Sequence, residues 1–380
     1  MKNREKEKQY FISLGAGYHQ TPLIKAARDL GYRVIGVDQD MHAQGLEFCD
    51  IRIEESILNY RKISYKLELA MMDGDIAGGF SASYGEAVLS WSYLADKLKL
   101  IGLPRTLSEH MLDKYWVRDN LTLMKHEKFG QPNFLEIAGK IKRSAVDSVG
   151  YPVVIKMREG HGKRNIAEKK DFESVKKYFS PTNLKHRKLS GTSMLIEEKI
   201  FGDEITVTGF VQDFKYTLIA ITDKVVSDKP PFIEIEHKYP SVHSDLSEKI
   251  HDIHQEAVEV LNLPNTPIVS EWKLHRGKLY LVEMSAQIPG EYLASYLIPA
   301  AMNYDYYNNL IKLCTGESVK YPPSLSRTKS GSVKFVLDKM SDEKWATYSS
   351  EYPFSRKLNE NPHHPARGNH DRFAVVGMVR

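Results

Sequence analysis

The first forty residues place the tightest limit on how this chain folds. Residues 10–14 are apolar and lead directly into a Gly-Ala-Gly turn at residues 15–17, after which apolar residues recur at helical spacing as far as Gly31. A second apolar run, residues 33–37, ends at Asp38. A buried strand, a tight turn, a helix and another buried strand form the unit from which parallel α/β sheets are built. We therefore predict that the chain opens with a parallel α/β sheet.

The same turn matches a dinucleotide-binding motif in part. That motif needs a third glycine at position 20, where the chain has Gln20, although Asp38 stands where a ribose-binding acid belongs. A dehydrogenase is therefore one alternative. The other is a helix N-terminus that faces a substrate carboxylate or phosphate.

A second glycine-containing turn follows the apolar strand at residues 153–156. Residues 158–163 read Arg-Glu-Gly-His-Gly-Lys, but Met and Arg occupy positions 157 and 164, so the Walker P-loop pattern is excluded. The backbone amides freed by Gly160 and Gly162 are suited to lie over phosphates, whereas a solvated basic turn fits this segment equally well. We expect the loop around His161 to be mobile without nucleotide and ordered with it.

Two glutamates in a predicted β-hairpin give the most informative local pattern. The strands lie at residues 269–274 and 278–284, and a loop at residues 275–277 has a glycine at the left-handed position that three-residue loops need. In that register Glu283 lies diagonal to Glu271 on the same face, about 7–8 Å away. Such a separation suits two carboxylates that hold Mg²⁺ together with phosphate oxygens.

The opposite face of the predicted hairpin is apolar. Its residues are Trp272, Leu274, Tyr280, Val282 and Met284. A two-residue loop would put the two glutamates on opposite faces, so we predict the three-residue loop. A single exposed strand glutamate is more often an ordinary surface residue, and it is the paired geometry that favours a metal site.

Another acidic segment follows the apolar run at residues 194–196. A strand that ends in acids and exposed backbone is suited to the edge of an adenine ring, although a loop of solvated charges fits the segment equally well. The sequence has two cysteines and contains no HExxH or GxSxG pattern. Neither a zinc site nor a serine or cysteine nucleophile is therefore indicated.

Taken in order, these segments resemble the ATP-grasp superfamily, in the branch of carboxylate–amine ligases near biotin carboxylase and carbamoyl-phosphate synthase. The resemblance extends over residues 10–380 and includes Asp113-Lys114 and the Glu-Met-Ser-Ala-Gln segment at residues 283–287. It implies a mixed α/β and α+β fold. The implied domains are a Rossmann-like pre-grasp domain at 1–106, a helix and small mobile lid at 107–193, and a C-terminal antiparallel-sheet domain with the metal site at 194–380.

The resemblance also implies roles for individual residues. Those that match the nucleotide-binding positions are Lys114, Lys156, Gly160, Gly162, Glu197, Glu198, Lys199, Ile200 and Glu204. Those that match the ligands of Mg²⁺, with Mn²⁺ as a substitute, are Glu271, Glu283 and Ser285. Residues 232–240 match the stretch beside the acceptor pocket, where His237 or Lys238 would approach phosphate.

Two positions depart from the family pattern. The family usually has Asn where this chain has Ser285, and Arg where it has Gln287. Serine still offers an oxygen to Mg²⁺ or to its water. The neutral glutamine cannot supply the positive charge that stabilises an acyl phosphate, so either another cation replaces it or the activity is altered or lost.

The function implied by the resemblance is an ATP- and Mg²⁺-dependent ligase. It would activate a carboxylate as an acyl phosphate and join it to an amine through a C–N bond, with Gln287 and Lys238 at the reacting groups. One alternative, favoured by Gln287, is a non-catalytic or altered ATP-binding protein of the same fold. Another is a biotin-type carboxylase, although the chain has no Ala-Met-Lys-Met carrier segment of its own.

Overall charge and composition agree with small-molecule partners, a carboxylate and an amine, and leave the oligomeric state open. The chain has 53 Lys and Arg against 49 Asp and Glu, which is too even for a nucleic-acid or membrane-surface protein. No uninterrupted apolar stretch of ~18 residues occurs, so we expect no membrane-spanning helix. Two cysteines and a charged start without a signal-peptide pattern lead us to expect a cytoplasmic protein.

Overall fold

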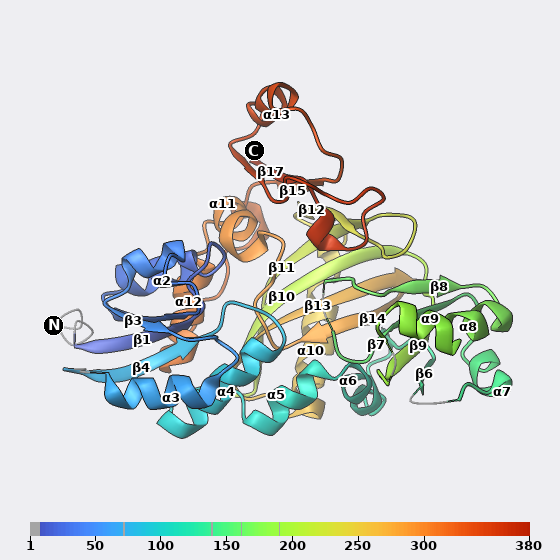
Figure 1. Cartoon of the computed structure of the whole chain (residues 1–380), viewed down its shortest axis with the longest axis horizontal. Coiled ribbons are helices and arrows are strands. Elements are labelled where there is room, and N and C mark those ends of the chain that lie inside the picture. Colours follow the sequence, from blue (N-terminus) through green and yellow to red (C-terminus); the bar gives the residue numbers. More distant parts are fainter. Residues whose placement is uncertain (1–7, 71–72, 138–139, 161, 190) are drawn as a thin grey trace.

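The structure, a computed structural model, describes residues 8–70, 73–137, 140–160, 162–189 and 191–380. The described strands form three sheets, which Figure 1 shows from left to right as a parallel sheet, a large central sheet and a small sheet. His161, the centre of the predicted mobile loop, lies outside the described residues.

The first sheet confirms the predicted Rossmann-like start. Its strands, in spatial order, are β3 (Ile51–Glu54), β2 (Arg33–Asp38), β1 (Gln9–Leu14) and β4 (Asp75–Phe80). All three pairings are parallel. The helices of this part are α2 (Thr21–Asp29), α3 (Tyr60–Leu69) and α4 (Glu86–Leu98).

The glycine turn after β1 is filled by the protein itself. The amide of Ala16 donates to Asp38 Oδ2 at 2.8 Å, so this carboxylate caps the turn. The side chain of Gln20 lies against Gly15 and Gly17 and donates to the carbonyl of Ala82 at 2.7 Å. A bound dinucleotide would need the space that Gln20 takes, so the turn does not support the dehydrogenase alternative.

The apolar pattern over residues 108–125 is typical of one helix, but the structure has two, α5 (Arg105–Leu112) and α6 (Lys114–Leu121). The break is at Asp113, whose carboxylate accepts the backbone amides of Tyr115 at 2.9 Å and Trp116 at 3.2 Å. This N-cap starts a new helix where the apolar periodicity alone indicates a continuous one. Lys114 is consequently the first residue of α6.

The small sheet lies at the right of Figure 1, with the strand order β6 (Phe134–Ile137), β9 (Met194–Glu198), β7 (Val153–Met157) and β8 (Ala167–Lys169). The helices α7 (Arg143–Asp147), α8 (Phe172–Tyr178) and α9 (Pro181–His186) belong to the same part, which has an apolar core of its own. The predicted division at residue 193 separates β9 from its partners β6 and β7. The pairing therefore favours a division after Glu198.

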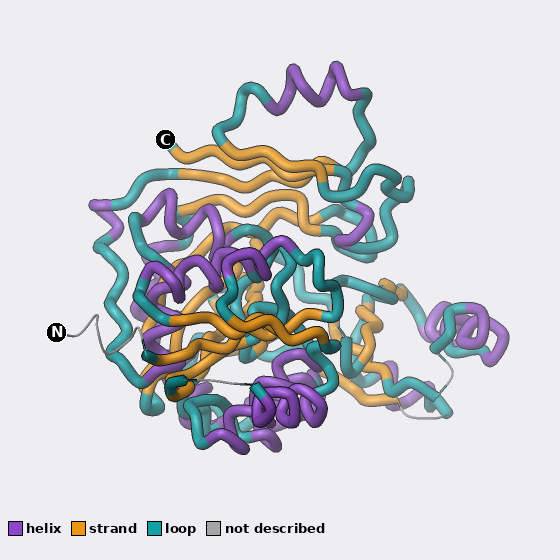
Figure 2. The backbone as a smooth tube through the Cα atoms, turned by 60° about the vertical axis from the view of Figure 1, so that its left-hand side comes forward, coloured by secondary structure: helices purple, strands orange, loops and turns teal. Residues whose placement is uncertain are grey.

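The central sheet has the strand order β16-β17-β15-β12-β11-β10-β13-β14-β5. In chain order its strands are β5 (Phe129–Gly130), β10 (Asp203–Gln212), β11 (Lys215–Val226), β12 (Glu234–Tyr239), β13 (Thr266–His275), β14 (Lys278–Ser285), β15 (Gly331–Val336), β16 (Phe354–Lys357) and β17 (Ala374–Val379). Every pairing is antiparallel except that of β5 with β14. The tube in Figure 2 shows these strands as one twisted surface.

Helix α10 (Ser247–Leu261), in which apolar residues recur at helical spacing, packs against β11 of the central sheet. Residues 292–313 have a helical apolar pattern, but the structure interrupts it. This segment consists of a π-helical turn (Leu293–Leu297), α11 (Ile298–Met302) and α12 (Tyr306–Thr315), because Asn303 takes a left-handed conformation. The last helix, α13 (Asp342–Ser349), projects at the top of Figure 1.

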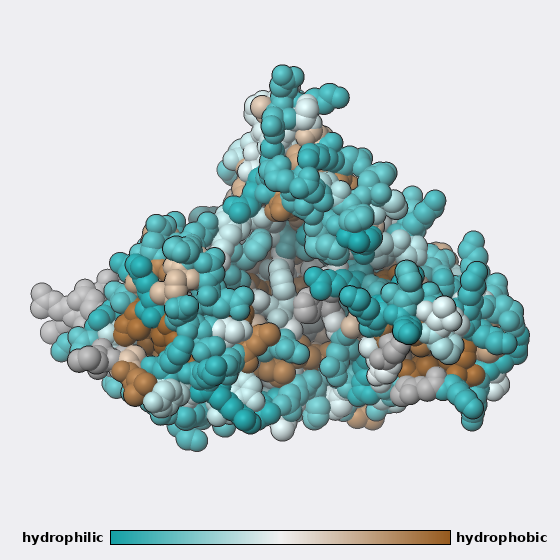
Figure 3. Space-filling model, in the orientation of Figure 1, coloured by the Kyte–Doolittle hydropathy of each residue, from teal (hydrophilic) through white to brown (hydrophobic). Residues whose placement is uncertain are grey.

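The face seen in Figure 3 is mostly hydrophilic, and its apolar side chains gather in separate small areas. Within the described ranges, no helix is long and apolar enough to cross a membrane.

Candidate functional site

The hairpin that carries Glu271 and Glu283 has a different loop from the predicted one. His275 pairs with Lys278, so the loop contains two residues, Arg276 and Gly277, rather than three. Both take the left-handed conformation of a type I′ turn, with φ of 48° and 77°. The prediction was wrong because it assumed a regular ladder, in which a two-residue loop would put the two glutamates on opposite faces.

A β-bulge restores the common face of the two glutamates. The register shifts between Trp272, which pairs with Leu281, and Glu271, which pairs with Glu283, so Val282 is the extra residue. The carboxylates therefore come from directly opposed residues rather than from diagonal ones. The two-residue loop also changes the apolar face, on which Leu279 and Leu281 are buried in place of the predicted Tyr280 and Val282.

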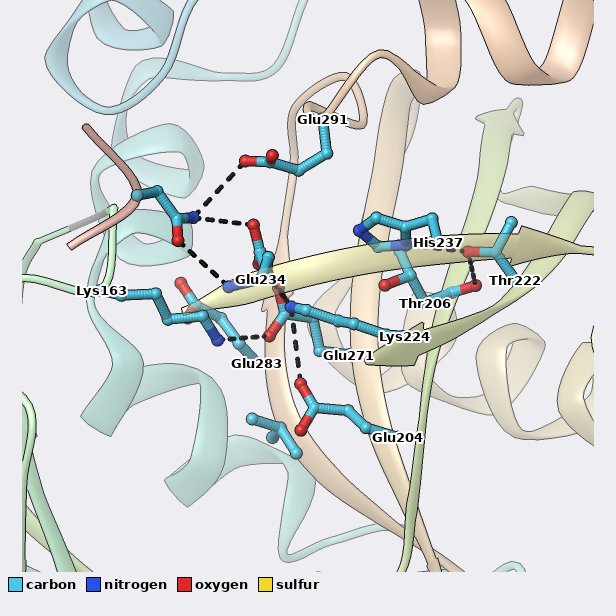
Figure 4. A network of polar contacts seen from close by, with 12 residues as sticks. Lys163, Glu204, Thr206, Thr222, Lys224, Glu234, His237, Glu271, Glu283 and Glu291 are labelled. Atoms are coloured by element: carbon cyan, nitrogen blue, oxygen red, sulfur yellow. Dashed lines mark hydrogen bonds and ion pairs between the residues drawn. The ribbon is translucent and has the colours of Figure 1, made fainter. Parts of the chain in front are cut away.

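Glu271 belongs to a buried network of ionised groups (Figure 4). The Lys224 ammonium lies 2.5 Å from Glu271 Oε1, 2.6 Å from Glu234 Oε1 and 3.5 Å from Glu204 Oε1. The Lys224 side chain is only 1% exposed. Burial alone would lower the pKa of Lys224, but the three carboxylates raise it well above its usual value. Lys224 thus remains charged and holds three acids together.

A lysine from another part of the chain faces each of the two hairpin glutamates. Lys163 Nζ lies 3.2 Å from Glu271 Oε2, and Lys114 Nζ lies 3.3 Å from Glu283 Oε1. Burial would raise the pKa of Glu271, but the charges of Lys163 and Lys224 outweigh it and lower the pKa to about 2. Glu271 is therefore ionised throughout the neutral range.

Lys156 and Glu197 form a second buried cluster. Lys156 Nζ lies 2.8 Å from Glu197 Oε2 and donates to the carbonyl of Val282 at 3.1 Å. Arg118, which the sequence analysis missed, donates to Glu197 Oε2 at 3.1 Å and to the carbonyl of Leu281 at 3.1 Å. Burial lowers the pKa of Lys156 to about 8. The Glu197 carboxylate thus faces two cations inside the protein.

The segment after β9 borders a small cavity of about 110 Å³. The residues that line this cavity include Glu198, Lys199, Ile200, Glu204, Val154, Phe232 and Leu281. The Lys199 amide donates to the carbonyl of Pro152 at 2.9 Å, and its ammonium lies 2.7 Å from Glu168 Oε2. Glu204 is buried and its Oε2 lies 3.2 Å from Lys273 Nζ. The apolar walls suit a flat aromatic ring.

A larger cavity of about 450 Å³ adjoins these groups, and many of the predicted residues meet there. Those that line it are Lys114, Lys156, Gly160, Gly162, Glu271, Glu283, Ser285 and Gln287. Lys238 does not, because its side chain is 53% exposed and pairs with Glu236 at 3.4 Å. Its neighbour His237 points the other way along β12 and lines the cavity.

Comparison with known proteins identifies a domain that supplies many of the residues that line this cavity. Residues 149–294 match the family described as ATP-grasp domain. The ATP-grasp match includes the lid strand with Lys156, the glycine loop and the β13-β14 hairpin with its two glutamates.

Solved structures agree with the ATP-grasp fold over the whole chain. An L-amino acid ligase from Bacillus licheniformis is similar over 98% of this chain and 93% of that chain, with TM-score 0.75 and 16% identity. A phosphoribosylglycinamide synthetase from Anaerococcus prevotii is similar over 98% and 94%, with TM-score 0.71 and 16% identity.

The biotin carboxylase domain of a Hydrogenobacter thermophilus 2-oxoglutarate carboxylase, solved with MgADP, ADP and bicarbonate, is similar over 98% and 86%. Its TM-score is 0.71 and its identity 14%. A search of curated protein sequences finds no match.

The C-terminal segment brings a cation to the ATP-grasp cavity that the sequence analysis missed. Arg372 lines the cavity, forms an ion pair with Glu291 Oε2, and lies 3.8 Å from Glu234 Oε2. Its guanidinium stacks over Phe335 at 3.8 Å from the ring centroid. Eighty-five positions separate it from Gln287, so no local motif signals that the two share a cavity.

Glu291 and His237 also line the cavity. Burial and the neighbouring charge of Glu234 raise the pKa of Glu291 to about 7, although Arg372 acts against this rise. Burial lowers the pKa of His237 to about 4, so its imidazole is neutral. Its Nδ1 lies 3.3 Å from Thr222 Oγ1, whereas its Nε2 has no hydrogen-bond partner among the described residues.

The donor set at the hairpin is suited to a hard cation. Glu271 on β13 and Glu283 on β14 offer carboxylate oxygens from opposed positions, and Ser285, also on β14, offers a hydroxyl. In the part of the chain that the structure describes, no three His, Cys, Asp or Glu side chains cluster as a complete metal site. Such partial oxygen coordination is typical of Mg²⁺, which keeps water and phosphate oxygens as its remaining ligands.

Proposed function

We propose that this protein is an ATP- and Mg²⁺-dependent ligase that joins a carboxylate to an amine. The observation that carries the proposal is one cavity in which the opposed glutamates Glu271 and Glu283 lie beside the cations Lys114, Lys156 and Arg372. Acids that suit a metal and cations that suit phosphate and carboxylate groups are what a phosphoryl transfer to a carboxylate requires.

In this proposal the nucleotide extends from the small cavity into the large one. The adenine ring lies between Val154 and Leu281, beside the backbone of residues 198–200. The ammonium groups of Lys156 and Lys114 then reach the phosphates, because both lysines line the cavity into which the triphosphate would extend. The amides at Gly160 and Gly162 would add uncharged donors.

Glu271, Glu283 and Ser285 would hold Mg²⁺, with Mn²⁺ as a substitute. When bound, the metal would neutralise charge on the phosphate oxygens. The positions of the carboxylate ligands are set by the chain itself, because the bulge at Val282 places Glu283 directly opposite Glu271.

In this proposal Arg372 supplies the positive charge that Gln287 lacks. We assign its guanidinium to the substrate carboxylate and to the acyl phosphate that forms when a carboxylate oxygen attacks the γ-phosphorus and ADP leaves. The amine nitrogen then attacks the acyl carbon and inorganic phosphate leaves. Glu291 takes the proton of the amine, since a carboxylate with a pKa of about 7 is a competent base near neutrality.

A screen of carboxylates against amines, read as Mg²⁺-dependent release of ADP, tests the proposal. We expect ADP release only when both an acid and an amine are present, with a C–N product detected by mass. ATP binding without ADP release for any pair would instead indicate a non-catalytic ATP-grasp protein. ADP release with bicarbonate and biotin alone would indicate a carboxylase.

The compartment is the remaining part of the proposal. Cys49 and Cys314 are both buried free thiols, and burial raises the pKa of the Cys49 thiol to about 12. We propose a cytoplasmic protein because buried, unoxidised thiols are typical of reducing compartments. Fractionation of cells that express the chain would test this.

A further inference from the structure

The two glutamates proposed to hold the metal are already neutralised by lysines. Lys163 lies in the segment between β7 and β8, and Lys114 begins α6, so both reach the hairpin from other parts of the chain. Their side chains are 14% and 13% exposed. Removal of one partner from a contact this well buried costs more free energy than it does in an ordinary surface ion pair.

Both oxygens of Glu271 are engaged. Oε1 lies 2.5 Å from Lys224 Nζ, and Oε2 lies 3.2 Å from Lys163 Nζ (Figure 4). Lys224 also pairs with Glu234 and Glu204 and is shielded from solvent, so we expect it to keep its contact with Glu271 when a ligand binds. A metal ion that approaches Glu271 therefore competes with Lys163.

The backbone around Lys163 is held in place for this contact. Lys163 has φ of 59°, a left-handed conformation that residues with a Cβ seldom adopt. The preceding residue, Gly162, packs against Gly368 of the C-terminal segment, since a Cβ on Gly368 would lie 3.1 Å from the Gly162 carbonyl oxygen. The Lys163 side chain thus points into the same cavity as Arg372.

A buried ammonium that loses its carboxylate needs another anion, because an unpaired charge in this environment is costly. A phosphate group of a nucleotide in the same cavity is such an anion. A phosphate that arrives without a metal, however, competes with Glu271 for Lys163. The metal alone therefore competes with Lys163 for Glu271, and the phosphate alone competes with Glu271 for Lys163. When both ligands bind, the metal takes Glu271 and the phosphate takes Lys163, so neither competition remains.

We infer that Lys163 binds a nucleotide phosphate and, in the ligand-free protein, occupies the place of the metal on Glu271. The inference rests on the proposed function, because it takes ATP and Mg²⁺ as the ligands. Lys163 thereby couples the two ligands: metal binding to Glu271 frees the ammonium, and phosphate binding to the ammonium frees the carboxylate. By thermodynamic reciprocity the coupling factor is the same in both directions.

Mn²⁺ binding, followed through the electron paramagnetic resonance signal of the free ion, tests this without any turnover. The titration is made with and without a non-hydrolysable ATP analogue that has an imido group between the β- and γ-phosphorus. In Lys163→Gln, Mn²⁺ alone should bind about tenfold more tightly and the analogue alone about tenfold more weakly than in the wild type. The coupling between them should fall by about tenfold or more.

Three further variants isolate the contact. Lys163→Met, uncharged but of similar length, should behave as Lys163→Gln does, and Lys163→Arg should keep the coupling. Lys273→Gln removes the same charge from the same strand as Glu271, but its ammonium lies 3.2 Å from Glu204 instead. It should change the affinity for Mn²⁺ alone by less than about twofold.

The outcomes separate the inference from the proposed function. A folded Lys163→Gln or Lys163→Met variant with wild-type affinities and coupling overturns the inference, while the wild type still binds both ligands. A wild-type protein that binds neither Mn²⁺ nor the analogue overturns both the inference and the proposed function. Melting curves of all variants establish that each is folded at the temperature of the titration.

Discussion

The change Glu283→Gln separates a metal ligand from an ordinary strand glutamate. It keeps the size of the side chain and removes its charge. In the ligand-free protein Glu283 is 33% exposed and pairs with Lys114 at 3.3 Å. Loss of a partly exposed pair of this kind changes the free energy of unfolding by about 0.5–1 kcal/mol, which is a shift of about 2–4 °C or less in a chain of this size.

Turnover should respond far more strongly. If Glu283 binds Mg²⁺, the change removes an anionic ligand of a hard cation and misplaces the charge that offsets the transferring phosphoryl group. We expect kcat for ADP release to fall by about 10²-fold or more, equivalent to about 2.7 kcal/mol of transition-state stabilisation. Excess Mg²⁺ or Mn²⁺ should restore part of the rate, because weaker binding is part of the loss.

Glu236→Gln is the matched control. Glu236 lies on β12 of the same sheet, is 21% exposed, and pairs with Lys238 at 3.4 Å, outside the cavity. It should lose the same small stability and keep full turnover. The metal assignment would be refuted if Glu283→Gln and Glu236→Gln gave the same melting curves and the same Mg²⁺ dependence of ADP release.

Three other changes have distinct expected outcomes. Glu271→Gln should lower turnover and also the free energy of unfolding by roughly 2 kcal/mol, because it leaves the buried Lys224 one carboxylate short; urea unfolding measures this. Burial and Glu234 raise the pKa of Glu291 from 4.5 in the unfolded chain to about 7 in the folded protein. Between pH 4.5 and 7 the folded protein therefore binds a proton that the unfolded chain has released, and its stability falls as the pH rises through this range. Glu291→Gln should remove this pH dependence of the free energy of unfolding. Asp113→Ala should raise KM for ATP, since the cap positions Lys114, and should cost about 2 kcal/mol or more, because the buried carboxylate also pairs with Arg158. Asp171→Ala, which uncaps α8 in the lid, should cost about 1 kcal/mol and leave KM unchanged.

The sequence predicts those parts of the fold that local periodicity controls. The parallel β1-α2-β2 unit and the bounds of α10 follow directly from apolar spacing and glycine punctuation. The break at Asp113 and the loop at Arg276 do not, because a capping carboxylate and a left-handed arginine each override the apolar pattern at a single residue. The two errors in the hairpin, loop length and bulge, offset each other, so the predicted common face of the glutamates is right for a wrong reason.

The residues of the candidate site likewise fall into those that the sequence indicates and those that it does not. Residues that lie in ordered motifs, such as Lys156 and Glu283, are found from the sequence because their strands carry recognisable flanking residues. Arg118, Lys224 and Arg372 are missed because each is a lone cation in an unremarkable segment, and only the packing of distant elements turns it toward the cavity. Lys238 shows the converse, since strand alternation directs it outward and its neighbour His237 inward.

A cation need not occupy a given sequence position in order to act on a given point in space. The Coulomb interaction depends on distance and on the surrounding dielectric, so the Arg372 guanidinium, which lines the same cavity as Gln287, also acts on a ligand there. Arg372 is held there by Glu291 and by the ring of Phe335, which limits its freedom before any ligand binds. A neutral residue at position 287 is therefore compatible with a catalytic ATP-grasp protein, and the argument for an inactive one based on Gln287 alone loses its force.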